Sequence, residues 1–353
     1  MNILITGGAG FLGARLARTL LAGKELSVAG ATPKPIEHIT LWDRMPPPAD
    51  LAADPRVQAQ VGDLNAVLNS VLESNDPQAS ATLKGAAIVF HLAAAVSAEC
   101  EADFDLGMRS NLAASMALFA ACHAAGTKPL VVSVSSLAVF GQTDLLPFPS
   151  VITDTTLPTP QTSYGAQKAM CELLLADYSR KGFLRGRSVR PMTVSVRPGK
   201  PNGAASGFFS GMVREPLSGV RSTVPVSIDT PVALASPAST VAGIVRAATA
   251  SDAEWGPYTA INLPGLCTSV REMAAALEKV AGPAATAFLD WQIDPHIARI
   301  VATWPGVVSF ERARGLGLQA DVSFEAVVRA YIADHPEAVH PDILAAVRRA
   351  PSP

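Results

Sequence analysis

The sequence contains few charged residues, and it has no long apolar run. Charged side chains make up 16% of the 353 residues and apolar side chains 49%, so the chain can bury a large core and is not of the disordered class. The formal net charge of −2 supplies no basic field, which argues against a nucleic-acid partner. The longest apolar run, residues 85–96, contains His91 and is shorter than the ~20 residues of a membrane span, so no membrane partner is expected.

Cysteine is scarce as well, with four in the whole chain. No two of them form a C-x-x-C pair and none has a histidine at ligand spacing, so we expect neither a metal site nor disulfides. No basic segment precedes the apolar run that starts at Ile3, which is unlike a secretion signal. We therefore expect a cytoplasmic protein with reduced thiols, packed as small apolar side chains, at Cys100, Cys122, Cys171 and Cys267.

Short apolar runs alternate with helical patterns over the first half of the chain. This alternation is typical of a parallel sheet that is covered by helices on both faces. We expect six strands over residues 2–6, 39–42, 57–61, 86–92, 130–134 and 193–197, and helices over 11–22, 111–125 and 164–180. The pattern predicts an α/β fold with a Rossmann-type doubly wound parallel sheet.

The character of the sequence changes after Pro198. Residues 199–231 are rich in Gly, Pro and Ser, which favours a loop-built lid or substrate wall. Two helices are expected further on, over 268–281 with Thr268 or Ser269 as N-cap, and over 323–334 with Ser323 as N-cap.

These features suggest how the chain divides into domains. We expect a Rossmann domain over residues 1–198 that is rejoined by about 232–263. A smaller C-terminal α/β lobe that binds the substrate is expected over 199–231 and 264–335, and a frayed tail over 336–353.

A glycine-rich turn follows the first expected strand, where residues 6–13 read Thr-Gly-Gly-Ala-Gly-Phe-Leu-Gly. Such a turn needs residues without a Cβ, because a pyrophosphate approaches the backbone closely and the following helix N-terminus supplies free N–H donors. A strand before the turn and a helix after it favour a dinucleotide-binding loop over a structural glycine turn. The predicted contacts are Gly7, Gly10, Phe11, Leu12 and Gly13.

An acidic residue, Asp43, ends the second expected strand. A carboxylate at this place accepts hydrogen bonds from the ribose hydroxyls and repels a 2′-phosphate, so NAD is favoured over NADP. Asp43 lies farther past the glycines than the usual ~20 residues, and an inserted loop around residues 29–38 explains the surplus. The alternatives are a solvated loop aspartate, and a 2′-phosphate contact from the adjacent Arg44.

Tyr164 and Lys168 stand four residues apart on an expected helix, so their side chains share one face. A phenol is a poor base near neutral pH, and a neighbouring ammonium stabilises its phenolate. Ser136 lies at the carboxyl end of the fifth expected strand, where doubly wound sheets place their ligands. Ser136 can donate a hydrogen bond to a substrate oxygen while Tyr164 exchanges its proton. Together with the glycine turn, these residues predict a dehydrogenase site.

Further segments carry a wider pattern: residues 6–13, 62–64, 91–94, 135–136 and 164–168. In these segments the chain resembles the extended short-chain dehydrogenase/reductase superfamily, which includes nucleotide-sugar epimerases and dehydratases. A second set narrows the resemblance: residues 101–108, 158–164, 196–202 and 214–217. These are similar to the D-erythronate dehydrogenase family, whose members oxidise the C2 hydroxyl of a four-carbon sugar acid with NAD.

One segment departs from that family's pattern. Residues 190–193 read Arg-Pro-Met-Thr where the family has Arg-Leu-Pro-Thr. We place this segment at the entrance of a strand and do not expect it to touch the chemistry.

The resemblance also implies cofactor contacts outside the glycine turn. It implies Asp63 and the backbone of Leu64 at the adenine, Leu92, Ala93 and Ala94 along the pyrophosphate and nicotinamide ribose, Asn111 as a brace of the fourth strand, and Pro198 and Gly199 near the nicotinamide. The alternatives are an Asx turn at Asp63 and a buried structural amide at Asn111. His91 is expected to be a hydrogen-bonded core histidine rather than a base.

A small carboxylate substrate requires a cation or a set of donors, and arginine offers a bidentate fork. Three cations near the expected pocket are candidates for this role: Arg197, Lys200 and Arg214. Besides Ser136, we expect two of Ser97, Lys200, Asn202 and Arg214 to contact the substrate. The alternative for Arg214 is a surface ion pair with Glu215.

The motifs thus predict an NAD-dependent dehydrogenase, and the resemblance implies that it oxidises the C2 hydroxyl of a small sugar acid, D-erythronate to 2-oxo-tetronate. In this reading Tyr164 is the base, Lys168 supports it and binds the nicotinamide ribose, and Ser136 orients the substrate oxygen. The alternatives are a nucleotide-sugar 4-epimerase that retains NAD and a non-catalytic dinucleotide-sensing protein. The superfamily resemblance also implies a homodimer formed through two helices of each subunit.

Overall fold

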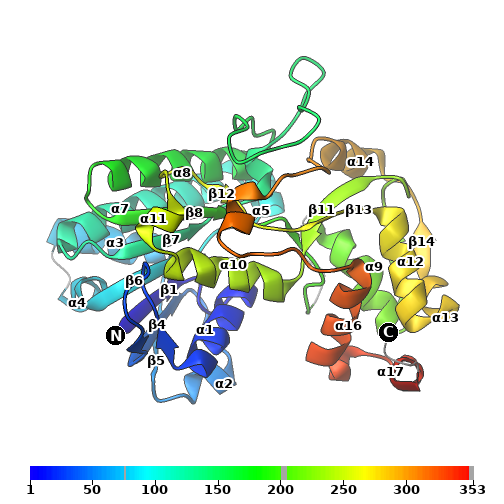
Figure 1. The fold of residues 1–353 in the computed structure, drawn as a ribbon, viewed down its shortest axis with the longest axis horizontal. Coiled ribbons are helices and arrows are strands. Elements are labelled where there is room, and N and C mark those ends of the chain that lie inside the picture. Colours follow the sequence, from blue (N-terminus) through cyan, green and yellow to red (C-terminus); the bar gives the residue numbers. More distant parts are fainter. Residues whose placement is uncertain (75–76, 200–204, 350–353) are drawn as a thin grey trace.

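A seven-stranded sheet forms the larger lobe in the computed structural model, which describes residues 1–74, 77–199 and 205–349 (Figure 1). Every pair of neighbouring strands is parallel. The strand order is β12 (Ile261–Asn262), β8 (Arg185–Arg190), β7 (Leu130–Val134), β6 (Ala86–His91), β1 (Asn2–Thr6), β4 (His38–Asp43) and β5 (Val57–Val61). Because the chain runs outward in both directions from β1, the crevice between β1 and β6 is a topological switch point. The expected doubly wound α/β fold is confirmed.

Helices cover both faces of this sheet, as the apolar strands predict. Ile3 and Ile5 pack in one core cluster with α1 (Phe11–Gly23) and α10 (Pro237–Thr249). Leu4, between them, points to the opposite face. The cluster on that face includes side chains of α3 (Leu64–Ser74), α7 (Ala114–Ala125) and α8 (Ser163–Arg180).

The sixth strand expected over residues 193–197 is wrong. The strand that extends the sheet there is β8, and residues 193–194 form the two-residue strand β9 (Thr193–Val194). Strand β9 pairs with β11 (Pro231–Ala235) in a separate three-stranded sheet. The loop that leaves the carboxyl end of the sixth sheet strand therefore begins at Pro191.

The polarity of β8 explains the error. Its sequence is Arg-Gly-Arg-Ser-Val-Arg, yet Arg187 and Arg190 are buried. Each guanidinium is neutralised by a carboxylate from elsewhere in the chain: Arg187 lies 2.6 Å from Asp252, and Arg190 lies 2.6 Å from Glu172. A buried strand whose charges are paired over long range has no apolar run to reveal it.

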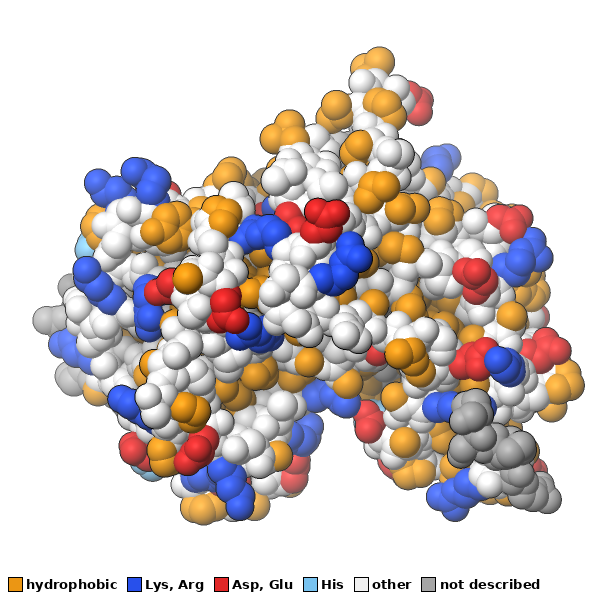
Figure 2. All heavy atoms as spheres, viewed as in Figure 1, with side chains coloured by type: hydrophobic (Ala, Val, Ile, Leu, Met, Phe, Trp, Pro, Cys, Tyr) orange, Lys and Arg blue, Asp and Glu red, His pale blue; other side chains and the backbone are white. Residues whose placement is uncertain are grey.

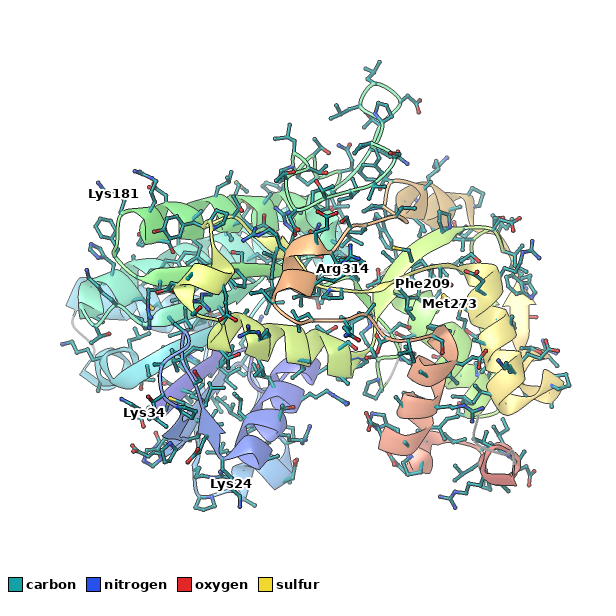
Figure 3. All side chains as sticks on the ribbon, in the orientation of Figure 1. Lys24, Lys34, Lys181, Phe209, Met273 and Arg314 are labelled. Atoms are coloured by element: carbon teal, nitrogen blue, oxygen red, sulfur yellow. The ribbon has the colours of Figure 1, made fainter. Side chains whose placement is uncertain are left out.

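The smaller lobe has its own core. Phe209 and Met273 are both fully buried in its core cluster, and Figure 3 labels them in this lobe. The lobe contains the sheet β13 (Leu266–Ser269), β11 and β9, and the pair β10 (Ser222–Val224) and β14 (Leu289–Trp291). Its helices are α9 (Gly207–Leu217), α12 (Val270–Ala281), α13 (Pro283–Thr286), α14 (Pro295–Ala302), α16 (Phe324–Asp334) and α17 (Pro341–Arg349).

Two helices of this lobe were expected from their caps. Helix α12 begins after Ser269, which forms a capping box with Glu272, and α16 begins after Ser323. Residues 199–231, expected as loops, include α9 and β10, and the expected frayed tail includes α17. The glycines and the proline of α9 hid a helix whose apolar side chains recur at helical spacing: Phe209, Met212, Val213 and Leu217.

The remaining elements are short. They are β2 (Glu25–Leu26), β3 (Lys34–Pro35), α2 (Ala49–Ala52), α4 (Pro77–Gly85), α5 (Ser97–Ala102), α6 (Phe104–Gly107), the π-helix η1 (Met108–Ala113), the 3-10 helix η2 (Leu137–Val139), α11 (Asp252–Trp255), α15 (Glu311–Gly315) and the 3-10 helix η3 (Pro336–Ala338). Figure 1 shows the segment between η2 and α8 as an arm that projects from the body.

The two lobes meet along the carboxyl edge of the large sheet. Figure 2 shows a notch between them on the side of α1 and α16, and an ion pair of 2.8 Å between Arg15 and Asp334 joins these two helices. Within residues 1–74, 77–199 and 205–349, no helix has both the length and the apolar character to cross a membrane. All four cysteines are free thiols. Three are buried as expected, whereas Cys267 is exposed.

Candidate active site

A cavity of about 380 Å³ lies at the carboxyl ends of β1, β6 and β7, beside the switch point. This volume is near the lower end for ligand sites. Its lining comes from four sources. They are the glycine turn (Gly7, Gly10, Phe11, Leu12 and Gly13), the segment after β6 (Leu92 and Ala94 to Ser97), the ends of β7 and α8 (Val134 to Ala138, Thr162, Tyr164 and Lys168), and the junction with the smaller lobe (Pro191 to Val194, Arg197, Ser206, Trp304 and Pro305).

The glycine turn is packed too tightly for side chains at two positions. Gly7 has a φ of +72°, and a Cβ there would lie 2.6 Å from the backbone nitrogen of Ala93. A Cβ on Gly13 would overlap the carbonyl oxygen of Gly7. The turn therefore brings the start of α1 directly under the end of β1.

The start of α1 suits a phosphate group. Its N-cap, Gly10, makes no side-chain cap, and its first turn contains no acidic residue. The first N–H groups of the helix, at Phe11, Leu12 and Gly13, therefore present uncapped donors and the positive end of the helix dipole at the cavity. These groups would hold the pyrophosphate of a dinucleotide.

Asp43 ends β4 beside this turn. One carboxylate oxygen accepts a 3.0 Å hydrogen bond from the N–H of Ala9, and the other accepts a 3.1 Å bond from the N–H of Met45. The carboxylate is thus fixed against the glycine loop, and each oxygen has a further lone pair with which a ribose hydroxyl could bond.

Asp63 follows β5 and serves as a helix cap. Its Oδ1 accepts a hydrogen bond of 2.9 Å from the N–H of Asn65 at the start of α3. This hydrogen bond forms the Asx turn that the sequence analysis gave as the alternative for Asp63. The next residue, Leu64, is buried in the core under α7. Neither lines the 380 Å³ cavity, which lies toward the opposite side of β1.

Ser136, Tyr164 and Lys168 line the cavity together. The Lys168 Nζ donates a 2.9 Å hydrogen bond to the carbonyl oxygen of Val134 and lies 5.7 Å from the centre of the Tyr164 ring. The Ser136 Oγ accepts a 3.1 Å bond from the N–H of Ala138, as N-cap of η2. Because that bond uses a lone pair, the hydroxyl hydrogen of Ser136 stays available to a substrate oxygen.

Close packing explains why these side chains meet. A Cβ on Gly165 would overlap the carbonyl oxygen of Ala138, so α8 lies directly against η2. Glu172, four residues after Lys168, accepts hydrogen bonds from the hydroxyl of Ser135 and from Arg190. Helix α8 is therefore tied to the carboxyl ends of β7 and β8, and Tyr164 is held next to Ser136.

Asn111 supports the cavity wall from behind. It is buried, and its side-chain oxygen accepts a 2.7 Å bond from the N–H of Ala95. Its amide nitrogen donates to the Ala95 carbonyl and to Gln167 Oε1. The side chain lies in the π-helix η1 and is not part of the cavity lining, so it braces the loop after β6.

His91 is a core histidine. Its Nδ1 lies 2.7 Å from the Thr6 hydroxyl and its Nε2 lies 2.9 Å from the Ser115 hydroxyl. Burial, aided by the positive charge of Lys168, lowers the pKa of His91 to about 3. The imidazole is therefore neutral at physiological pH and has both nitrogens engaged.

The expected substrate contacts fall in different places. Ser97, at the start of α5, lines the cavity. Lys200 and Asn202 lie outside the described residues. Arg214 is buried but does not line the cavity; it donates hydrogen bonds to the carbonyl oxygen of Arg197 and to Glu215.

The end of β8 at Arg190 changes which segment borders the cavity. Pro198 and Gly199 do not line the cavity. The segment after the true strand, Pro191–Val194, does so instead, although its unusual sequence was expected to lie away from the chemistry. Correct placement of β8 would have identified this segment from the order of the strands.

Two further lining residues, Trp304 and Pro305, had no signal in the sequence. They also line a second cavity of about 320 Å³ below the arm. Trp304 packs against Phe209 of α9, with ring centres 6.5 Å apart. Trp304 and Pro305 therefore form a wall between the two cavities.

The chain is similar to known proteins over most of its length. Residues 3–230 match the NAD dependent epimerase/dehydratase family. A D-erythronate dehydrogenase from Cupriavidus necator is 47% identical over 95% of this chain and 98% of its own, and one from Haemophilus influenzae is 38% identical over 94% and 99%. The crystal structure of a nucleoside-diphosphate-sugar epimerase from Agrobacterium tumefaciens is 40% identical, with a TM-score of 0.85, and covers 96% of this chain and 95% of its own.

Proposed function

The chain belongs to the NAD dependent epimerase/dehydratase family and is an oxidoreductase that uses a nicotinamide dinucleotide, and from this premise we propose its reaction. We propose that it oxidises the C2 hydroxyl of a small sugar acid, D-erythronate, to the 2-oxo acid. Two relatives named D-erythronate dehydrogenase, each similar over nearly their whole length, support this substrate.

The observation that carries the proposal is the shared position of Ser136, Tyr164 and Lys168. All three line the cavity that the glycine turn also lines. A base, a cation that supports it and a hydrogen-bond donor therefore surround the place next to a bound dinucleotide. This set suits the oxidation of a secondary alcohol.

Each side chain has one task in the proposed step. A nicotinamide dinucleotide held by the glycine turn would supply the acceptor for the C2 hydride. Tyr164, as the phenolate, takes the hydroxyl proton, so C2 and its oxygen form a carbonyl. Lys168, held by the Val134 carbonyl, would stabilise the negative charge on Tyr164 and would bond the nicotinamide ribose. Ser136 donates its hydroxyl hydrogen to the substrate oxygen and orients it.

A preference for NAD over NADP is part of the proposal. The Asp43 carboxylate, fixed beside the glycine turn, would accept hydrogen bonds from the adenosine ribose. The same charge would repel a 2′-phosphate.

A homodimer and a cytoplasmic location complete the proposal. Helices α7 and α8 expose large apolar side chains: Met116, Met170 and Leu173, the last with 73% of its surface exposed. A second copy packed on these helices would cover them. Light scattering coupled to gel filtration tests this state, since a single-chain mass would contradict it.

The test of the reaction uses purified protein with added NAD and D-erythronate. We expect NADH to accumulate in proportion to the acid consumed. The alternative, a nucleotide-sugar 4-epimerase, is suggested by the name of the Agrobacterium tumefaciens structure. It predicts that a UDP-sugar is interconverted without added NAD and without net NADH.

A further inference from the structure

Arg197 is a half-buried cation in the wall of the catalytic cavity. In the part of the chain that the structure describes, its guanidinium makes no ion pair and no hydrogen bond. The neighbouring residues 200–204, which lie outside that part, read Lys-Pro-Asn-Gly-Ala and contain no carboxylate. Arg197 thus lines the cavity with a positive charge that has no carboxylate in ion-pair contact among the described residues.

The arginines that are fully buried in the described part of the chain are each paired with a carboxylate. Arg187 and Arg190 each lie 2.6 Å from a carboxylate, and Arg214 lies 2.5 Å from Glu215. The pairing is expected, because a charge removed from water without a partner costs free energy. Burial, together with the positive charge of Arg214, lowers the pKa of the Arg197 guanidinium. An anion in the cavity would relieve both effects.

The backbone of Arg197 is held at both of its polar groups. Its N–H donates a 3.0 Å hydrogen bond to the Ser210 hydroxyl, and its carbonyl oxygen accepts a 2.8 Å bond from Arg214. Ser210 and Arg214 belong to α9 and are buried. Because Glu215 neutralises Arg214, one net positive charge remains, and it is on the arginine that lines the cavity.

We propose that Arg197 binds the carboxylate of the substrate and thereby selects a 2-hydroxy acid over a neutral polyol. This inference rests on the proposed function. A guanidinium can bond both oxygens of a carboxylate at once, which fixes the orientation of the neighbouring C2 as well as the charge. Arg214 and Glu215 act as positioning residues, since they touch Arg197 or its partner rather than the cavity.

The dinucleotide pyrophosphate is the other anion that must enter this cavity. It has its own place at the uncapped start of α1, formed by backbone groups at Phe11 to Gly13. Arg197 belongs to a different part of the lining, the junction with the smaller lobe that follows β9. The acid substrate is therefore the better partner for Arg197.

The test compares Arg197→Met and Arg197→Lys with the unaltered protein, and Arg299→Met serves as control because Arg299 is an exposed arginine on α14. Steady-state rates are measured with D-erythronate and with its uncharged amide. We expect Arg197→Met to raise KM for the acid about 30-fold or more, and to change the KM for NAD and kcat/KM for the amide less than about threefold. Arg197→Lys should restore part of the loss, because it keeps the charge and loses the fork.

A second measurement separates contact from structure. Guanidinium ion added to Arg197→Ala should recover activity on the acid and leave activity on the amide unchanged. Equal losses on acid and amide, or a raised KM for NAD in place of the acid, would overturn the proposal. If the unaltered protein turns over no small acid, the proposed function fails. Arg197 is then judged by calorimetry of D-erythronate with the NAD-loaded protein, where undiminished binding to Arg197→Met contradicts its role.

Discussion

The Lys168 ammonium lies 5.7 Å from the centre of the Tyr164 ring while it donates a hydrogen bond to the Val134 carbonyl. This hydrogen bond to the end of β7 fixes the position of the ammonium group, and so it also fixes the distance between the ammonium and the Tyr164 ring. This places a positive charge near the phenol before any ligand arrives, which supports the proposal that Tyr164 is the base.

Replacement of Tyr164 by Phe should abolish most of the turnover and leave NAD affinity within a few-fold. The change removes the group that accepts the substrate proton, worth about 10² to 10⁴-fold, and leaves the glycine turn intact. Steady-state kinetics and NAD titration measure the two effects. More than a tenth of the original kcat would show that another residue is the base.

Asp43→Ala should weaken NAD binding and reduce the preference of the enzyme for NAD over NADP. The carboxylate that would bond the ribose and repel a 2′-phosphate is then absent. The measurement is the ratio of kcat/KM with NAD to kcat/KM with NADP. An unchanged ratio in Asp43→Ala would place the ribose contact elsewhere.

Gly165→Ala should lower both stability and activity, because the new methyl group would collide with the Ala138 carbonyl. Overpacking of this kind costs about 1–3 kcal/mol, and here it also moves α8 away from Ser136. Gly23→Ala is the matched control, since a Cβ at that helical position meets no atom within 4 Å. Denaturant unfolding and kcat measurements should show lower stability and lower activity for Gly165→Ala than for Gly23→Ala. Equal behaviour would contradict the packing argument.

Acid should destabilise the protein through His91. Its pKa is lowered to about 3 in the folded state, against about 6.5 in an unfolded chain, so the unfolded state binds the extra proton between these values. The stability that depends on neutral His91 is therefore present above about pH 6.5 and is lost as pH falls toward 3, by at most about 1.4 kcal/mol per pH unit. His91→Asn should flatten the unfolding free energy between about pH 6.5 and 4.5. If the unfolding free energy of His91→Asn depends on pH in the same way as that of the unaltered protein, the acid sensitivity comes from other groups.

Trp304→Ala should shift the substrate range toward longer acids. Trp304 and Pro305 separate the catalytic cavity from the second cavity of about 320 Å³, and loss of the indole would join them. We expect kcat/KM for six-carbon acids to rise relative to that for D-erythronate. If this ratio of kcat/KM values is unchanged and the variant is as stable as the unaltered protein, Trp304 and Pro305 do not limit the length of the substrate.

Local spacing made much of the site predictable. The glycine turn and the Tyr164–Lys168 pair depend on residues within one turn or one helix, and the structure brings both to the cavity. Long-range pairing hid the rest. Strand β8 contains arginines whose partners, Asp252 and Glu172, come from other parts of the chain, and no local pattern reveals such a strand. The sixth sheet strand was therefore expected to end at residue 197, whereas it ends at Arg190.

The smaller lobe shows the same limit. Trp304 reaches the cavity from a segment with no motif, and only the packing of α9 and the loop after α14 brings it there. Arg214 was expected among the substrate contacts because of its charge and place in the chain. Its side chain instead supports the backbone of Arg197, which a sequence pattern does not distinguish from a contact with ligand.

The most direct measurement of the central claim uses D-erythronate that carries deuterium at C2. In the proposed step Tyr164 takes the hydroxyl proton, so the hydrogen that reaches the cofactor must come from C2. We predict that the reduced cofactor isolated after turnover with NAD carries one deuterium, and that the product is the 2-oxo acid. Reduced cofactor without deuterium, or exchange of a UDP-sugar with no net NADH, would contradict the account.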